Sequence, residues 1–273
     1  MQNFKILFIG DIVGRPGREI VRQFLIEQKQ KDNYDFVIAN IENASHGFGL
    51  TKKNHDELMS YGIDCMTSGN HIWDKKDILS YIDESEVLIR PYNYHKSVAG
   101  VGYRIFNNKI IVINLLGKTF MPPIDCPFVS LDNIFEELKE KTDLENKIII
   151  IDFHAEASAE KQCLLRYASE KYNVSLVVGT HTHVQTADEK VYNKCAYITD
   201  VGCCASKNSI IGMEYEASVK RLLTSINERF DVEVEKPYIL NAVEVSFDNN
   251  IPKEIRRINF ELNEQEELSD EKN

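Results

Sequence analysis

The chain has 273 residues, of which 43% are apolar and 27% charged, so it can bury a substantial core and is typical of a globular protein. Its 43 acidic and 32 basic residues give a formal net charge of −11, which argues against stable DNA binding, because phosphate contacts need clustered Lys and Arg. The first residues, MQNFKILFIGD, do not resemble a signal peptide, and no apolar run approaches the ~18 residues of a membrane span, so we expect a cytoplasmic protein that does not bind membranes.

The expected strands are short apolar runs that recur along the chain, with helical patterns between many of them. Several runs are continuously apolar, which is typical of strands that are covered on both faces. In chain order the runs are Ile6–Ile9, Phe36–Ala39, Asp64–Thr67, Val87–Ile89, Ile110–Ile113, Ile148–Ile151, Leu176–Val178 and Ala196–Thr199.

Helices are expected where capping residues and apolar spacing agree. Arg18–Gln30 carries an apolar stripe and is entered through Pro16, a residue that favours the first helical turn. Asn54–Tyr61 follows a Thr51 cap and stops at Gly62.

Later parts of the chain contain further helix signals. Asp74 and Ser158 have side chains that can cap a helix, so we expect helices to start there. The four-residue spacing of Leu222, Ile226 and Phe230 predicts another helix with a buried apolar stripe.

Two hairpins interrupt the alternation of strands and helices. Tyr103–Ile113 is expected to turn at Asn107-Asn108, and Tyr238–Phe247 is expected to turn through residues 248–250 into Ile255–Phe260. Because hairpins add antiparallel strands, the sheets must be mixed, and two packed sheets flanked by helices fit the pattern best.

No internal repeat or low-complexity linker divides the chain, so we predict one domain over residues 1–260. The last thirteen residues, 261–273, carry six acids and one base, and we expect this acidic tail to be disordered. The six cysteines form no C-x-x-C pair, so we expect reduced thiols and no disulfide framework.

Polar side chains of the kinds that bind metals follow five of the expected strands. In open α/β sheets ligands bind at the carboxyl ends of strands, so parallel neighbours would bring these groups to one edge. We therefore predict that the two histidines of the last group face the acidic, amide and imidazole side chains of the others. The groups are Gly10-Asp11, Asn40-Ile41-Glu42-Asn43, Ser68-Gly69-Asn70-His71, Asp152-Phe153-His154-Ala155-Glu156 and Gly179-Thr180-His181-Thr182-His183.

Imidazoles, carboxylates and an amide, with no thiolate, suit Mn, Fe, Ni or Zn. The donors exceed what one tetrahedral ion needs, and a bridging carboxylate allows two ions ~3.5–4 Å apart, the usual clamp for displacement at phosphorus. A separate imidazole can then protonate the leaving alcohol. Taken singly, Asp11 could be a helix cap, Glu42 and Asn43 turn residues, and His71 or His154 a core histidine. The joint pattern is what favours a metal site.

Six segments also carry a family resemblance, and their motifs are long and occur in order from residue 1 to about residue 260. These segments are GDIVGRPGR (10–18), NIENASHGFGLT (40–51), SGNHIWD (68–74), DFHAEASAEK (152–161), GTHTHVQTADE (179–189) and AYITDVG (196–202). They resemble the YmdB-like branch of the calcineurin-like metallophosphoesterases. This resemblance implies a four-layer αββα sandwich with two mixed sheets, a binuclear metal centre, and hydrolysis of phosphodiesters with 2′,3′-cyclic nucleotides as the substrate class.

The resemblance also implies a ligand set for two ions bridged by Glu42. The first ion would be held together with Asp11 and His183. Asn43, beside the bridging Glu42, would either ligate an ion or orient a neighbouring ligand. The second ion would be held by residues from three later strand ends: Asn70, His154 and His181.

By the same resemblance, His71 would donate the proton to the leaving group. Position 13 is Val where the wider superfamily has His, and Glu42 stands where it usually has Asp, so the metal stays open, with iron or manganese favoured and zinc or nickel as alternatives. A homo-oligomer is expected from the family. The alternative to an enzyme is a non-catalytic or slow-turnover nucleotide- or metal-binding regulatory protein, which would keep the same ligands.

Overall fold

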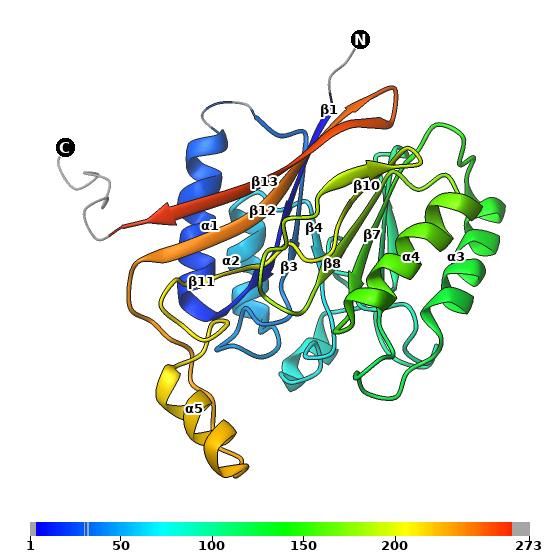
Figure 1. Cartoon of the computed structure of the whole chain (residues 1–273). Helices are drawn as coiled ribbons and strands as arrows, with labels where there is room; N and C mark the ends of the chain where they lie inside the picture. The colour runs from blue at the N-terminus through cyan, green and yellow to red at the C-terminus, as the bar shows by residue number, and fades with distance from the viewer. Residues whose placement is uncertain (1–3, 30, 32, 264–273) are drawn as a thin grey trace.

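The computed structural model describes residues 4–29, 31 and 33–263, and two β-sheets packed face to face dominate it (Figure 1). The first sheet has seven strands, and its path runs β2-β11-β12-β1-β3-β4, with β13 paired to β12. Their bounds are β1 (Phe4–Ile9), β2 (Asp11–Ile12), β3 (Phe36–Asn40), β4 (Cys65–Thr67), β11 (Cys203–Ser206), β12 (Tyr238–Asp248) and β13 (Ile251–Leu262).

The second sheet has six strands in the order β5-β6-β7-β8-β10-β9. Its central strands β6, β7, β8 and β10 are parallel, whereas both edge strands are antiparallel to their neighbours. The bounds are β5 (Tyr103–Phe106), β6 (Ile110–Leu116), β7 (Ile148–His154), β8 (Leu176–Thr180), β9 (Lys190–Tyr192) and β10 (Cys195–Ile198).

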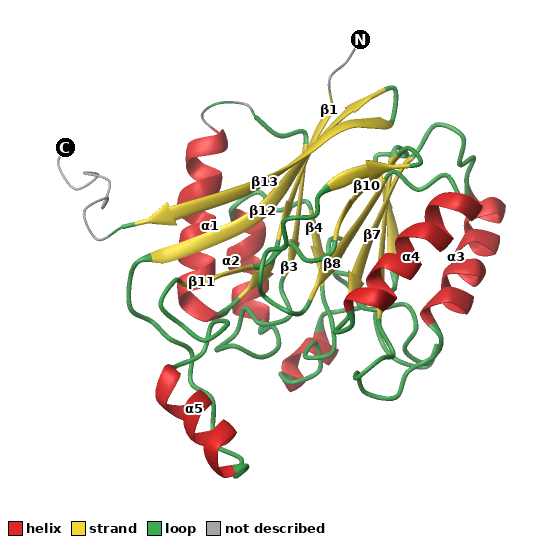
Figure 2. Cartoon of the chain, viewed as in Figure 1, coloured by secondary structure: helices red, strands yellow, loops and turns green. Residues whose placement is uncertain are grey.

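Helices cover the outer face of each sheet, as Figure 2 shows. The first sheet is covered by α1 (Gly14–Lys29) and α2 (Lys52–Ser60), and the second by α3 (Pro127–Lys141) and α4 (Ser158–Lys171). The predicted four-layer αββα sandwich with two mixed sheets is therefore confirmed. None of the helices among the described residues is long and apolar enough to cross a membrane.

Three apolar cores separate the four layers. In β1, Leu7 packs against the helices of the first sheet, whereas its neighbour Phe8 packs between the two sheets. A third core joins the second sheet to α3 and α4 through residues such as Phe135 and Leu164. Since successive strand residues point to opposite faces, a strand covered on both faces must be apolar throughout, which explains the continuous apolar runs.

Both predicted hairpins are present. β5 and β6 pair around Asn107 and Asn108, and β12 and β13 pair around Asn249 and Asn250. All four asparagines have positive φ, which two-residue hairpin turns require. Thr51 caps α2 as predicted, because its side chain accepts a hydrogen bond from the Asn54 amide.

Several local predictions are wrong. Val87–Ile89 forms only an isolated bridge from Leu88 to Met66 instead of a strand. Ser158 is the first residue of α4 and makes no capping hydrogen bond. A short 3-10 helix (η1, Lys76–Ser80) follows Lys75, so Asp74 does not cap it.

The helix predicted around Leu222, Ile226 and Phe230 is displaced. α5 (Tyr215–Thr224) stops before Ser225, a left-handed residue with φ 57°, and Leu222 and Ile226 are 83% and 62% exposed. The stripe is therefore not buried. We call residues 207–237, which connect β11 to β12 and project from the sandwich, the α5 segment (Figure 1).

The predicted acidic tail falls mostly on residues 264–273, which lie outside the described residues. Its first two residues, Glu261 and Leu262, belong to β13. All six cysteines are free thiols, and Cys203 in β11 pairs alongside Asp11 in β2.

Candidate metal centre

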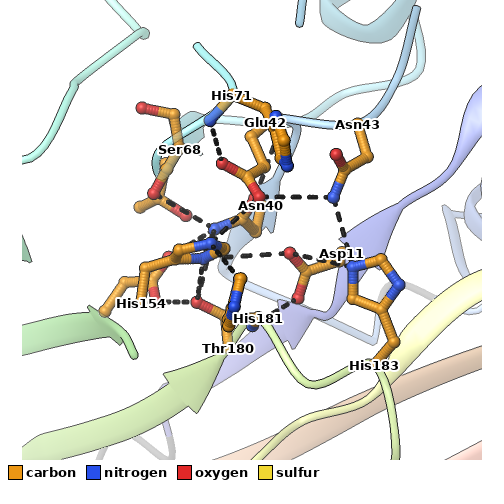
Figure 3. Close-up of polar contacts among 12 residues, drawn as sticks. Asp11, Asn40, Glu42, Asn43, Ser68, His71, His154, Thr180, His181 and His183 are labelled. Atoms are coloured by element: carbon orange, nitrogen blue, oxygen red, sulfur yellow. Dashed lines mark hydrogen bonds and ion pairs between the residues drawn. The ribbon is translucent and has the colours of Figure 1, made fainter. Parts of the chain in front are cut away.

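Most of the predicted donors meet where β1, β3, β7 and β8 end, as Figure 3 shows for Asp11, Glu42, Asn43, His154, His181 and His183. Three donors form a compact group whose ligand atoms all lie within 4.8 Å of one another: Glu42 after β3, His154 at the end of β7 and His181 after β8. His154 Nε2 is 2.9 Å from Glu42 Oε1 and 3.1 Å from His181 Nδ1. Glu42 and His154 are completely buried.

A second group of donors lies around Asp11, which is also completely buried. Its Oδ1 is 3.7 Å from His183 Nε2 and 3.9 Å from His154 Nδ1. Asn43 Nδ2 lies 3.2 Å from His183 Nε2 and 3.3 Å from Glu42 Oε1. Asn43 and Glu42 therefore connect the two groups of donors.

Asn70, another predicted ligand, has a side-chain oxygen without a hydrogen-bond donor in the described part of the chain. Its Oδ1 is buried and accepts no hydrogen bond from the described residues, and Asp11 Oδ1 is in the same condition. The neighbours of Asn70 do reach the site: a Cβ on Gly69 would lie 2.4 Å from Glu42 Oε2 and 2.3 Å from His154 Cδ2. Buried oxygens without donors are costly unless they bind a cation or water, so both fit a metal site.

The hydrogen bonds of His183 and His181 fix which ring nitrogen carries the proton. His183 Nδ1 is 2.8 Å from the Ile211 carbonyl, which can only accept, so Nδ1 donates and Nε2 keeps its lone pair. His181 Nε2 lies 3.1 Å from the Glu156 carboxylate, so its Nδ1 keeps the lone pair. A carboxylate or carbonyl behind the imidazole is the usual support of a metal-binding histidine.

His154 is oriented by a longer chain of hydrogen bonds. Thr180 Oγ1 donates to Asp152 Oδ1 at 2.7 Å, so it accepts from His154 Nδ1 at 2.9 Å. In the neutral ring the lone pair is therefore on His154 Nε2, which lies 3.1 Å from His181 Nδ1 and 2.9 Å from Glu42 Oε1. Two such lone pairs repel unless a proton or a metal ion lies between them, which makes a bound cation the natural complement of this geometry.

The electrostatics of the metal-free site point the same way. Burial alone would lower the pKa of His154, but the Glu42 and Asp11 carboxylates raise it, so a proton is held where a cation would bind. Burial, together with the charge of His154, lowers the pKa of His181 to about 3. Burial opposes the charge of Glu42, but its contacts with His154 lower its pKa, so the carboxylate stays ionised.

Under these donors lies a set of residues that sequence reasoning did not identify. Asp152 accepts hydrogen bonds from Asn40 Nδ2 at 3.0 Å and from Thr180 Oγ1 at 2.7 Å. All three are completely buried, and burial raises the pKa of Asp152 to about 6. Asn40, Asp152 and Thr180 stand within the predicted strand-end groups, but nothing in the sequence separates a support from a ligand.

A buried ion pair extends this support to the turn that carries His181 and His183. Lys161 Nζ is 2.7 Å from Asp200 Oδ2, and Asp200 Oδ2 also accepts from the Thr182 amide and hydroxyl. Both histidines have positive φ, 98° and 63°, an uncommon conformation that surrounding contacts must hold. We call Asn40, Asp152, Thr180, Lys161 and Asp200 the buried polar network.

His71 lies beside the donors without being one of them. Its backbone amide donates to Glu42 Oε2 at 2.8 Å, whereas its ring contacts Asp74, with Nδ1 2.8 Å from Asp74 Oδ2. Asp74, expected to cap a helix, is instead the partner of this imidazole. The ring packs edge-on against Phe48, and its side chain is 32% exposed, which leaves Nε2 available to a bound molecule.

A pocket of about 490 Å³ opens in front of the donors. Glu42, Asn43 and the three histidines at positions 71, 181 and 183 line one part of it. The α5 segment supplies much of the remainder, including Met213, Arg221, Leu222 and Phe230. The pocket thus joins a polar, donor-rich end to an apolar end, a combination typical of small-molecule sites.

Comparison with known proteins gives one consistent picture. Residues 7–258 match the family model described as YmdB-like protein. Over 256 residues, 92% of this chain and 94% of the relative, the chain is 44% identical to the 2′,3′-cyclic-nucleotide 2′-phosphodiesterase of Bacillus subtilis strain 168.

Two solved structures share the fold at 34% identity. A hypothetical protein from Thermus thermophilus superposes with a TM-score of 0.85, covering 94% of this chain and 99% of its own. A structure described as a novel phosphatase from Mycoplasma pneumoniae superposes with a TM-score of 0.86, covering 96% and 95%.

Proposed function

The chain belongs to the YmdB-like protein family, and from that premise we propose that it hydrolyses 2′,3′-cyclic nucleotides at a binuclear metal centre. The broader statement, that it is a phosphoesterase, rests on the 44% identity to the Bacillus subtilis 2′,3′-cyclic-nucleotide 2′-phosphodiesterase along nearly the whole chain. The use of metal ions, the mechanism and the cyclic-nucleotide substrate are what we propose beyond that activity.

The observation that carries the proposal is the convergence of imidazole nitrogens and buried carboxylates at one point. Asp11, Glu42 and His183 would hold one ion, with Asn43 beside them. Glu42 would bridge to a second ion held by the three remaining donors: Asn70, His154 and His181. Nitrogen and oxygen donors without thiolate suit iron or manganese, with zinc or nickel as alternatives.

Such ions, when bound, acidify water and offset the charge that builds on phosphate oxygens during hydrolysis. The residues of the chain do the rest. Thr180 of the buried polar network holds the other ring nitrogen of His154. The Glu156 carboxylate does the same for His181 and the Ile211 carbonyl for His183, so each imidazole is kept in the ligating tautomer.

We assign the proton transfer to His71. Asp74 accepts from Nδ1, so Nε2 is the nitrogen left for a molecule bound in the pocket that His71 lines, and the contact with Phe48 restrains the ring plane. In the protonated state Nε2 would donate to the ribose oxygen that leaves phosphorus. General acids of this kind contribute about 10²–10⁴-fold to the rate.

The test is to strip the purified protein with a chelator, restore Mn²⁺ or Fe²⁺, and measure hydrolysis of 2′,3′-cAMP. We expect activity only after metal is restored, with one water added per nucleotide consumed. A metal-loaded protein that binds the nucleotide tightly in calorimetry but does not turn it over would contradict catalysis and support the regulatory alternative.

A further inference from the structure

A second cavity, of about 640 Å³, adjoins the pocket of the candidate metal centre. The two cavities share the side chains of Phe48 and Phe230, so a molecule can extend from one into the other past these rings. Three cations line the second cavity: Arg15, Lys75 and Arg229. In a chain with a net charge of −11 this local excess of positive charge is unusual and indicates an anionic ligand.

Two of these cations are uncompensated. Arg229 Nε lies 3.3 Å from Asp231 Oδ1, and Asp231 also lines the cavity, so this pair is nearly neutral. Within the part of the chain that the structure describes, Arg15 and Lys75 form no ion pair with a carboxylate. Their charges are therefore free to contact an anion that enters the cavity.

The side chains between the two cavities suit a nucleobase. Phe48 lies edge-on to His71 with ring centroids 5.0 Å apart, so it stands next to the proposed proton donor. Phe230 carries the Arg221 guanidinium over its ring at 5.0 Å. Aromatic and guanidinium faces stack on nucleobases with little sequence preference.

We propose that the second cavity is a subsite for an additional phosphate, and that the preferred substrate is a nucleoside 2′,3′-cyclic phosphate that carries a phosphate on its 5′ side. This inference rests on the proposed function. The cyclic phosphate lies at the candidate metal centre, the base packs against Phe48 and Phe230, and the 5′-side phosphate contacts Arg15 and Lys75.

The reaction balances without another reactant. Water adds its oxygen to the cyclic phosphorus, one ring P–O bond breaks, and the released ribose oxygen takes up a proton. The 5′-side phosphate is unchanged and serves only for binding. It can be a terminal 5′-phosphate, or the last internucleotide linkage of an RNA whose 3′ end was left cyclic by attack of its own 2′-hydroxyl.

The experiment compares kcat/KM of the metal-loaded protein for three substrates. These are adenosine 2′,3′-cyclic phosphate, its 5′-phosphorylated form, and the dinucleotide ApA ending in a 2′,3′-cyclic phosphate. Two exposed charge contacts should favour a substrate with the extra phosphate by about tenfold, and added salt should reduce this ratio. If kcat/KM rises only for the 5′-phosphorylated nucleotide, the cavity binds a terminal 5′-phosphate. If kcat/KM also rises for the dinucleotide, the cavity binds the last internucleotide linkage of an RNA end.

Variants locate the effect in the cavity. Arg15→Gln and Lys75→Gln should each lower the ratio of kcat/KM with the 5′-side phosphate to kcat/KM without it about threefold, because each removes one phosphate contact. Lys53→Gln, an exposed lysine on α2 outside both cavities, is the matched control and should leave the ratio unaltered.

Two results overturn the inference in distinguishable ways. Equal kcat/KM for all three substrates, or a ratio that Arg15→Gln and Lys75→Gln do not change, removes the subsite and leaves the proposed function standing. Failure to hydrolyse any of the three removes both.

Discussion

The buried polar network and the α5 segment both border the candidate metal centre, but they are held in opposite ways. In the network each polar atom has partners inside the protein: Asp152 and Asp200 each accept hydrogen bonds from more than one side chain. In α5, by contrast, only Ser218 is buried, and Leu222 and Leu223 are 83% and 80% exposed.

This difference separates two tasks. Metal donors must be placed within a fraction of an ångström, and buried hydrogen bonds with no freedom to move achieve this. A surface that receives a substrate needs shape and exposed charge, which a lightly anchored segment can supply. Substitutions in the network should therefore be severe, and most of those in the α5 segment mild.

The largest expected effect is at His71, which lies between the two regions. His71→Asn removes the proposed proton donor, so kcat for 2′,3′-cAMP should fall about 10²–10⁴-fold while the metal content per chain is retained. Turnover and elemental analysis of the same preparation check this. Loss of metal in this variant would mean that His71 is a ligand instead.

Asp74→Asn is the companion to that variant. It keeps the imidazole but weakens the acceptor at Nδ1, so we expect a smaller loss, about tenfold, with metal retained. A loss as large as that of His71→Asn would show that Asp74 does more than orient the ring.

The next effect concerns folding. Lys161→Met leaves Asp200 buried without its partner, and such changes cost about 3–5 kcal/mol of unfolding free energy. Denaturant unfolding of the metal-free protein measures it. Arg166→Met, on the same helix but in an exposed pair with Glu170, is the control and should not change stability measurably.

The smallest effect is expected on the outer side of α5. Leu223→Ala should change the unfolding free energy by less than about 0.5 kcal/mol, because this side chain is mostly in water already. Leu164→Ala, a fully buried leucine on α4, should cost about 2–5 kcal/mol in the same assay. Equal costs would mean that α5 is packed more tightly than its exposure indicates.

The sheets and the convergence of the donors could be predicted from the sequence for a physical reason. Strands buried on both faces are continuously apolar, and a polar group directly after such a strand can only lie at the sheet edge. Asp11, Glu42 and His154 each follow their strand run within a few residues, so their positions could be predicted.

The rest depends on contacts between distant residues. Lys161 and Asp200 are 39 positions apart, and neither carries a local sign that the other lies beside it. Asp74 is a residue type that often caps helices, but its carboxylate instead accepts a hydrogen bond from His71, three residues earlier. In the α5 segment, the spacing of Leu222 and Ile226 fits a helix but says nothing about what covers it.

The central claim is that these strand ends hold two metal ions bridged by Glu42, and anomalous diffraction from crystals of the metal-loaded protein tests it most directly. We predict two peaks ~3.5–4 Å apart, one beside Asp11 and His183 and the other beside His154 and His181. A single peak, or ions bound elsewhere on the molecule, would contradict it.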